Sequence, residues 1–319
     1  MTKHRAVAYT MQALVKYHGM KNPALRIPFH DSISVNTTCM MTEATVSDEA
    51  RGGVFIEGKT SDSANARLDT VMASISHGSR SADFRFDSRN VPKGRPKGIG
   101  YSSSAGAVLT LLAHRMLAGD TPDLRDLSRK ARLFAASASR SLVGGFSRLY
   151  AGDDDHSTFA ERFADSSTMD LRMVVVPLPS NVRTEDAHRE VLTSPFFEAR
   201  VKSAQKRCDE MEAAIMGNDL ERLGTLAEKD TMELHALTMT GENRLIIMNE
   251  DSIRIIRKVR ELRSGGADAY FSLQTGPSVF INTSEKDQSR VHRAISRLGY
   301  TAYLSGVGGE AHILEASND

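Results

Sequence analysis

The first sixty residues alternate apolar and polar side chains with the two-residue period that is typical of β-strands. Three segments rich in β-branched residues therefore predict strands, at residues 4–10, 32–47 and 53–58. A polar stretch from about Lys59 to Ser81 follows, and we expect it to contain one helix. The pattern predicts that the chain opens with strands.

A helical period begins at Ala105, and Gly119 has the position expected just past the end of that helix. Thr121 and Pro122 predict the cap and the first residue of another helix. The later pattern predicts a buried strand, two long amphipathic helical spans, a strand pair, a helix and a last strand, at residues 173–179, 184–239, 252–263, 269–281, 287–298 and 301–309.

The order of these elements determines the fold class. Strands and helices mix without strict β-α-β alternation, which favours an α+β fold over a doubly wound one. We place a domain boundary just before the buried strand, so the prediction is an N-terminal domain at 1–171 and a C-terminal domain at 172–319. With 319 residues, the chain has ample material for two cores.

Composition and charge exclude several functions. The 41 Lys and Arg residues against 40 Asp and Glu give a net charge of +1, which indicates no general affinity for nucleic acid or membranes. Neither a secretion signal nor a run of membrane-spanning length is present. Cys39 and Cys208 lack metal-ligand spacing and suit a reducing compartment. We expect a cytoplasmic protein without a metal site.

One segment carries candidate chemistry, the Gly- and Ser-rich stretch at residues 92–106 that precedes a helix. Glycines let backbone N–H groups converge, and a helix N-terminus adds the positive end of its dipole, so such a loop can hold a phosphate. No Gly-Lys-Ser/Thr ends the stretch, which excludes the Walker pattern. Taken alone, the pattern fits a flexible surface loop equally well.

This stretch resembles the phosphate loop of the GHMP kinase superfamily. More closely, the chain resembles the mevalonate-pathway decarboxylases, above all the archaeal phosphomevalonate decarboxylase type. Further segments carry the match in the family's order: LVKYHGM and LRIPFHDSISV near the N-terminus, then ASASRSLVGGF and TSPFFEARV, at residues 14–20, 25–35, 136–146 and 193–201.

The resemblance implies a two-domain α+β fold, with an N-terminal half like domain 2 of ribosomal protein S5, a ferredoxin-like C-terminal half and a cleft between them. It also implies a homodimer and a small phosphorylated mevalonate as substrate. In this family the tertiary 3-hydroxyl is phosphorylated, and loss of that phosphate and of CO₂ leaves an alkene. Members that perform both steps use an Asp in an Asp-x-Gly-Pro-Asn turn, together with a Lys and an Arg.

The family's catalytic lysine and arginine match Lys16 and Arg140. An ammonium at Lys16 would stabilise charge on a departing phosphate, and the Arg140 guanidinium would hold a carboxylate with two hydrogen bonds. Without the resemblance, Lys16 would fit a solvated lysine at a strand end, and Arg140 a helix arginine paired with a glutamate.

The resemblance also implies substrate-binding residues. Tyr17 would donate to the 5-phosphate, although half-buried packing fits it nearly as well. The hydroxyl groups assigned to substrate binding, some of which could instead cap helices, are those of Ser102, Ser103, Ser104, Ser137, Ser139, Thr193 and Ser194. Met20 stands where relatives that use a diphosphate carry Lys, which favours a 5-monophosphate substrate.

Two departures from the family pattern affect the phosphorylation step. Gln274 takes the position of the Asp, and an amide cannot act as a base; we still expect Gln274 to face the substrate. The phosphate loop also contains an apparent insertion, in which Lys93, Arg95 and Lys97 would suit a substrate with an additional phosphate. A solvated basic loop without a role is the alternative for the insertion.

The retained residues serve elimination, while the departures affect phosphorylation. The sequence therefore favours ATP-independent decarboxylation of mevalonate 3,5-bisphosphate to isopentenyl phosphate, with no cofactor. One alternative is an ATP-dependent phosphomevalonate or diphosphomevalonate decarboxylase, which would need ATP and Mg²⁺. A second is a mevalonate 3-kinase, although such kinases tend to lack the residue present here as Lys16. A third is a binding protein without catalysis.

Overall fold

The computed structural model describes residues 3–48, 52–94 and 98–314. Its larger sheet is built around two long antiparallel strands, β1 (Lys3–Val15) and β4 (Ser32–Ser47). The path of this sheet is β14-β1-β4-β7-β5-β6, and β8 pairs with β4 and β9. The remaining strands are β5 (Gly53–Ile56), β6 (Lys59–Thr60), β7 (Arg85–Val91), β8 (Phe146–Leu149), β9 (Ala160–Ala164) and β14 (His312–Leu314).

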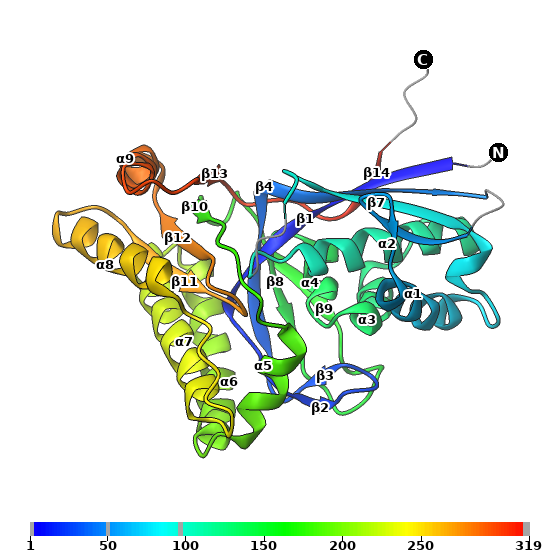
Figure 1. The fold of residues 1–319 in the computed structure, drawn as a ribbon, viewed down its shortest axis with the longest axis horizontal. Helices are drawn as coiled ribbons and strands as arrows, with labels where there is room; N and C mark the ends of the chain where they lie inside the picture. Colours follow the sequence, from blue (N-terminus) through cyan, green and yellow to red (C-terminus); the bar gives the residue numbers. More distant parts are fainter. Residues whose placement is uncertain (1–2, 49–51, 95–97, 315–319) are drawn as a thin grey trace.

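Four helices cover one face of this sheet (Figure 1). They are α1 (Asp62–Ile75), α2 (Tyr101–Leu117), α3 (Leu124–Phe134) and α4 (Ala138–Val143). Gly119 has a φ of 77° just past α2, as predicted. The prediction that α2 begins at Ala105 was wrong, because its first turn includes the serines. The prediction of Thr121 as the cap of α3 was also wrong. The cap is Asp123, whose side chain accepts a hydrogen bond from the N–H of Asp126.

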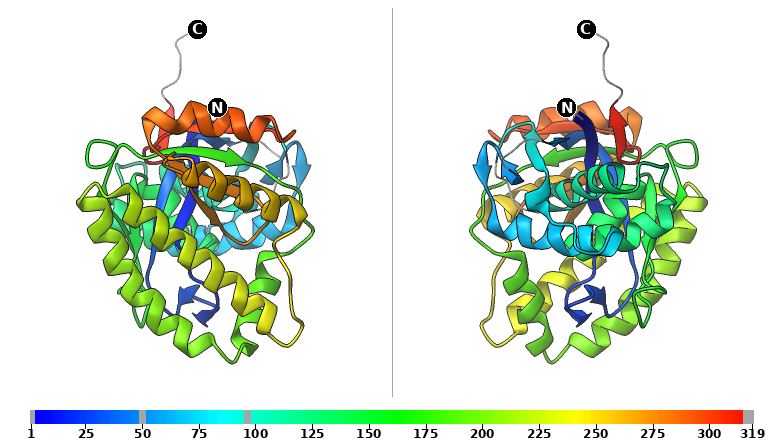
Figure 2. Two further views of the ribbon diagram at one scale, coloured as in Figure 1. Left: turned by 90° about the vertical axis from the view of Figure 1, so that its left-hand side faces the viewer. Right: turned by 90° about the vertical axis from the view of Figure 1, so that its right-hand side faces the viewer.

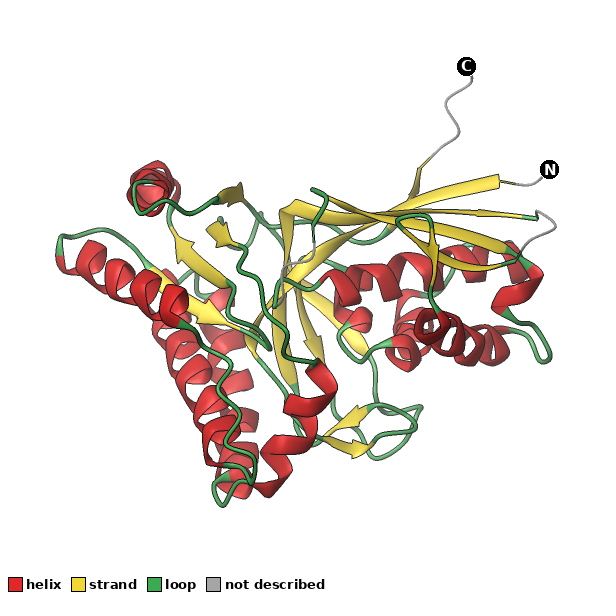
Figure 3. Cartoon of the chain, viewed as in Figure 1, coloured by secondary structure: helices red, strands yellow, loops and turns green. Residues whose placement is uncertain are grey.

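The second sheet has the order β11-β12-β10-β13 and is antiparallel. Its strands are β10 (Arg172–Val176), β11 (Tyr270–Leu273), β12 (Val279–Thr283) and β13 (Tyr303–Ser305). Side chains of β10 alternate between its two faces: Met173 and Val175 pack toward α6 (Phe197–Met216) and α7 (Leu220–Thr240). Val174 and Val176 pack toward α8 (Glu250–Ser264) and α9 (Glu285–Ser296). The secondary-structure view in Figure 3 shows these helices on both sides of the sheet.

Two predictions for this half needed correction. The helical span predicted from 184 to 239 is interrupted: α5 (Thr184–Glu190) and a 3₁₀ turn (Val191–Thr193) precede α6, and a break separates α6 from α7. The last predicted strand is shorter than expected, and the chain then crosses back so that β14 pairs with β1. Leu314 lies opposite Arg5, so both described ends of the chain meet at one edge, as both views in Figure 2 show.

Strand β1 positions the site. Its first residues are exposed or half-buried, but most of its second half is buried on both faces. The change occurs because the strand passes from the one-sided sheet into the space between the two halves, where α6 and α7 pack on it. A short hairpin that was not predicted follows, formed by β2 (Met20–Asn22) and β3 (Ile27–Pro28). The segment between β1 and this hairpin lies where both halves meet.

Candidate active site

Lys16 directly follows β1, and its backbone is held by the second half of the chain. Its N–H donates to Asp230 Oδ2 at 2.9 Å, and its carbonyl accepts from Arg200 Nη2 at 3.0 Å. Arg200 also donates to Asp230 Oδ1 at 2.7 Å. This buried pair on α6 and α7 therefore fixes where Lys16 leaves the strand.

Lys16 and Arg140 both contact the ring of Tyr17. The Lys16 Nζ lies 4.6 Å and the Arg140 Cζ 5.4 Å from the ring centroid. Burial lowers the pKa of Lys16 to about 7, with a further lowering by Arg140, while Asp230 opposes the shift. Burial also lowers the pKa of Arg140 to about 10. The two catalytic residues predicted from the sequence are thus brought together beside one aromatic ring.

Arg140 is fully buried, and none of its three guanidinium nitrogens finds a hydrogen-bond partner among the described residues. A buried cation in this state is costly, and an anion that reaches it would satisfy several donors at once. Arg140 lies in the short helix α4, and Gly144 with a φ of 68° follows that helix. The arrangement favours the binding of a carboxylate or phosphate.

A cavity of about 630 Å³ lies between the N-terminus of α2 and the turn that joins β11 to β12. We name it the loop cavity; its lining includes Lys16, Gly98, Gly100, Ser102, Ser103, Ser137, Gln274 and Thr275. Gly100 has a φ of 92°, and a Cβ there would lie 2.8 Å from the carbonyl oxygen of Met11. Only glycine therefore lets the loop approach β1 this closely. Ser103 Oγ donates to Ser137 Oγ at 2.7 Å.

Gln274 lines the loop cavity, and its side chain connects two segments of the chain. Its Nε2 donates to the carbonyl of Met11 at 3.0 Å and to that of Gly98 at 3.3 Å. The amide thereby ties the glycine loop to β1. Next to it, Thr275 Oγ1 and His18 Nε2 share a hydrogen bond of 2.7 Å. No Asp or Glu is among the described residues that line this cavity.

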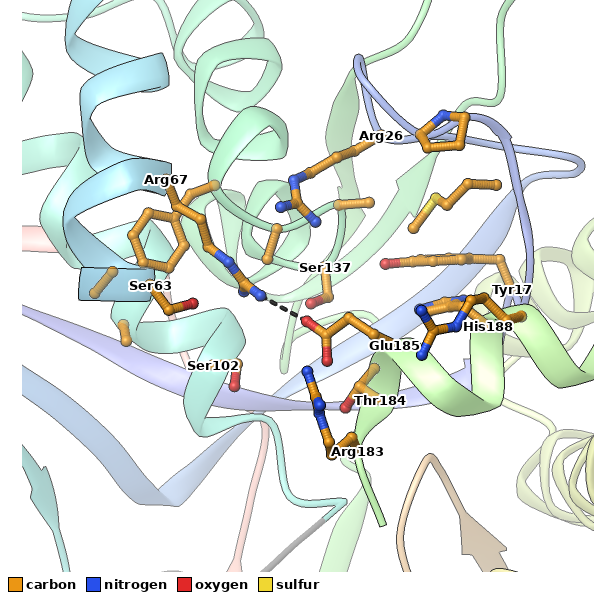
Figure 4. A pocket seen from close by; sticks show the side chains of 18 of the residues that line it. Tyr17, Arg26, Ser63, Arg67, Ser102, Ser137, Arg183, Thr184, Glu185 and His188 are labelled. Carbon is orange, nitrogen blue, oxygen red and sulfur yellow. Dashed lines mark hydrogen bonds and ion pairs between the residues drawn. The ribbon is translucent and has the colours of Figure 1, made fainter. Parts of the chain in front are cut away.

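A second cavity of about 620 Å³ adjoins the first, and both are lined by Lys16, Ser102, Ser137 and Thr184. We name it the arginine cavity because its lining also includes Arg26, Arg67, Arg183 and Arg189, with Glu185 (Figure 4). Arg67 Nη2 donates to Glu185 Oε1 at 2.6 Å, which joins α1 to α5. Burial raises the pKa of Tyr17, although Arg140, Arg26 and hydrogen bonding to Ser137 oppose it.

His188 lies against Tyr17 in the arginine cavity. The two rings stack with centroids 5.6 Å apart and an angle of 12°. The N–H of Gly19 donates to His188 Nδ1 at 3.0 Å, which leaves the ring proton on Nε2. Burial lowers the pKa of His188 to about 3, so the ring is neutral at neutral pH. It supplies a donor without adding positive charge.

Arg140 and four predicted hydroxyl residues do not line either cavity, although Arg140 lies against Tyr17, which lines the arginine cavity. Ser139 donates to the carbonyl of Ala136. The remaining three hydroxyl groups bond protein atoms elsewhere: Ser104 contacts Thr42, Thr193 donates to the carbonyl of Glu190, and Ser194 contacts Thr240.

Of the predicted basic insertion, the backbone at Gly94 lines the loop cavity, but the described basic side chain, Lys93, lines neither cavity. Lys93 is exposed and lies 4.0 Å from Glu57. Arg95 and Lys97 lie outside the described residues. Two arginines that precede the insertion are paired with acids: Arg85 with Asp87 at 2.7 Å and Arg89 with Glu43 at 2.8 Å.

The sequence analysis identified neither the charged residues of the arginine cavity nor the Arg200–Asp230 pair that holds the backbone of Lys16. Arg26, Arg67, Glu185 and His188 lie in three separate segments, and no spacing rule relates them. Arg26 alone gave a local signal, since it stands between apolar residues in LRIPF. The described residues contain no cluster of three or more His, Cys, Asp or Glu that could hold a metal ion.

The chain was compared with known families and proteins. Residues 8–160 match the diphosphomevalonate decarboxylase-like N-terminal domain, and residues 181–303 match the mevalonate 5-diphosphate decarboxylase C-terminal domain. The chain is 36% identical to the phosphomevalonate decarboxylase of Haloferax volcanii, over 99% of this chain and 98% of the relative. The chain belongs to the diphosphomevalonate decarboxylase family.

Other members agree with this assignment. The mevalonate 3,5-bisphosphate decarboxylase of Thermoplasma acidophilum is 29% identical over 86% of this chain and 69% of the relative. The mevalonate diphosphate decarboxylase structure from Staphylococcus aureus is 26% identical with a TM-score of 0.88, over 98% of each chain. The expected GHMP-superfamily membership and the α+β fold are confirmed. The protein is a mevalonate-pathway decarboxylase, a carboxy-lyase. Within the described residues, no helix combines the length and apolar character needed to cross a bilayer.

Proposed function

We propose that this decarboxylase acts on mevalonate 3,5-bisphosphate without ATP and releases isopentenyl phosphate, CO₂ and inorganic phosphate. The observation that carries the proposal is Gln274. Its amide is engaged with the carbonyls of Met11 and Gly98, and no carboxylate lies among the described residues of the loop cavity. Phosphorylation of a tertiary hydroxyl benefits from a base to orient and activate it, and an amide cannot serve. Elimination needs no such base.

In the proposed reaction the C3–O bond breaks, and its electron pair leaves with the phosphate. The C1–C2 bond then supplies the electrons of the new C2=C3 double bond as CO₂ departs. Arg140, which has unpartnered donors on a buried guanidinium, would hold the carboxylate. The Lys16 ammonium would stabilise the phosphate that leaves, with Ser102 and Ser137 as further donors. No nucleotide and no metal enter this scheme.

The second candidate is ATP-dependent decarboxylation of mevalonate 5-phosphate. The 36% identity to the Haloferax volcanii phosphomevalonate decarboxylase favours it. In that case ATP and Mg²⁺ would be required, and the glycine loop before α2 would hold the nucleotide phosphates. A carboxylate outside the loop cavity, such as Glu185 in the adjoining arginine cavity, would then have to orient the hydroxyl.

One assay separates these reactions. The purified protein is incubated with mevalonate 3,5-bisphosphate in EDTA without nucleotide, and CO₂ and isopentenyl phosphate are measured. Product under these conditions is the expected result. Turnover of mevalonate 5-phosphate only with ATP and Mg²⁺ would refute the proposal in favour of the second candidate. A phosphorylated product without CO₂ would indicate a 3-kinase, and no reaction with any substrate would indicate a binding protein.

A further inference from the structure

The arginine cavity contains more positive charge than its own residues neutralise. Its described lining has five cationic side chains and one carboxylate, namely Lys16, Arg26, Arg67, Arg183 and Arg189 against Glu185. Arg189 has a separate ion pair with Asp186 at 2.5 Å. The other cationic side chains line one half-open cavity, in which like charges repel one another unless an anion is present.

Arg26 lies in this cavity at a conformational cost. It lies in the β2–β3 hairpin with a φ of 52°, a region that side chains other than glycine and asparagine rarely adopt. Its Nε donates to the carbonyl of Leu133 at 2.8 Å, which aims the rest of the guanidinium into the cavity. Burial and the nearby Arg67 both lower the pKa of Arg26. A strained, partly desolvated arginine beside another arginine is typical of a site built for an anion.

Glu185 occupies the position where such an anion would neutralise these arginines. Its carboxylate accepts from Arg67 at 2.6 Å, and it also favours the charged form of Arg26. About half of its side chain is exposed, so it can leave the pair at little cost. Figure 4 shows Arg26, Arg67, Ser137 and the Tyr17 hydroxyl directed toward the same space, with Glu185 at its border.

We propose that Arg26 and Arg67 form a clamp for the terminal phosphate of the substrate, and that Glu185 neutralises this clamp until the phosphate displaces it. The clamp would hold the 5-phosphate, while Lys16 and Arg140, which both contact the ring of Tyr17, would act on the groups at C3 and C1. The inference rests on the proposed function for the identity of the ligand. Glu185 is then a residue that weakens substrate binding.

The test is the affinity for mevalonate 5-phosphate, measured by calorimetry without ATP. This probe carries the 5-phosphate that both candidate reactions require, so the result does not depend on which reaction the enzyme performs. We expect Arg26→Asn to weaken binding by about tenfold, because a charge-assisted hydrogen bond to phosphate is lost. Asparagine tolerates the left-handed conformation, so this variant should fold, as its melting curve would show. Arg67→Gln should act in the same direction.

Glu185→Gln should change the affinity for mevalonate 5-phosphate in the opposite direction. We expect affinity to rise by about fivefold, because the phosphate no longer competes with a carboxylate for Arg67. Glu161→Gln is the matched control, since Glu161 is similarly exposed and pairs with Arg125 outside both cavities, so its loss should leave the affinity within about twofold of wild type.

Unchanged or weaker binding in Glu185→Gln would overturn the inference, as would an Arg26→Asn variant that binds like the control. An ADP titration distinguishes a nucleotide site. If the variants change ADP affinity but leave mevalonate 5-phosphate affinity unchanged, the clamp belongs to a nucleotide and the inference is wrong.

Discussion

Replacing Arg140 by methionine should stabilise the free protein and abolish its activity. Burial lowers the pKa of Arg140 from its ordinary value to about 10. Each pKa unit corresponds to about 1.4 kcal/mol, so the charged guanidinium costs about 3 kcal/mol in the folded state. Because the folded pKa is the lower one, this cost is fully present below about pH 10, and hence at neutral pH.

Part of that cost is offset by the ring of Tyr17, which lies 5.4 Å from the Arg140 Cζ. A cation–π contact of this kind contributes about 1 kcal/mol. Arg140→Met should therefore raise the free energy of unfolding by about 2 kcal/mol, because an unbranched apolar side chain fills the same space without a charge to desolvate. The melting temperature should rise by about 3 °C.

The assay combines urea denaturation with turnover. Arg132→Met is the matched control, because Arg132 is equally buried but pairs with Asp155 and donates to the carbonyl of Thr158 at 3.2 Å. Removing it breaks an ion pair that Asp155 only partly keeps through Arg129, so the variant should be destabilised by about 2 kcal/mol. Arg140→Lys keeps a charge but cannot bind two oxygens, so it should also lose most activity. If Arg140→Met destabilised the protein as much as the control, the assignment of Arg140 as an unpartnered anion receptor would be refuted.

Three further predictions concern the surroundings of Arg140. The proposed reaction requires the ammonium of Lys16, so kcat/KM should fall as pH rises through about 7. Asp230→Asn should move this fall to lower pH, because Asp230 raises the pKa of Lys16; an unchanged pH profile would contradict this. Gln274→Glu should cost about 2 kcal/mol in urea denaturation, since a carboxylate would face the two carbonyls that the amide now satisfies; it should also fail to create ATP-dependent activity. Gly100→Ala should lower stability by at least about 1 kcal/mol, because its φ is 92° and the added Cβ would meet Met11; a wild-type melting temperature would argue against that geometry.

The sequence predicted well those parts of the fold that depend on local pattern. Strand β4, the turn at Gln274 that joins two strands and the glycine at the end of α2 all follow from periodicity and turn chemistry. For β1 the prediction covered only residues 4–10, although the strand continues to Val15. The hairpin between β1 and β4 was missed, because its strands are only two and three residues long. The return of β14 to β1 is a pairing across nearly the whole chain, which no local pattern encodes.

In the candidate site, too, residues in local sequence patterns could be predicted, and residues brought together only by packing could not. Lys16 and Arg140 could be predicted because each lies in a long segment shared with a family. The hydroxyl groups in the same segments were less informative, since Ser139 and Thr193 satisfy backbone carbonyls instead. Ser and Thr do this in many settings, so their presence in a motif does not distinguish a ligand donor from a local brace. Arg67 required the structure, because only packing brings it near the site.

Arg140 and the clamp arginines differ in whether another protein group neutralises their charge before an anion binds. Among the described residues Arg140 has no counter-ion, and it is fully buried, so its desolvation cost is already met on folding. In the proposed reaction the substrate carboxylate would therefore gain the full interaction in a water-poor environment. Arg67 is partly exposed and holds Glu185, so a phosphate there must exchange with an existing partner. Binding at the clamp should therefore be weak and sensitive to salt, whereas binding at Arg140 should be strong and little affected by it. A substrate that fills both sites gains most from the buried one, which is where the bonds at C1 and C3 break in the proposed reaction.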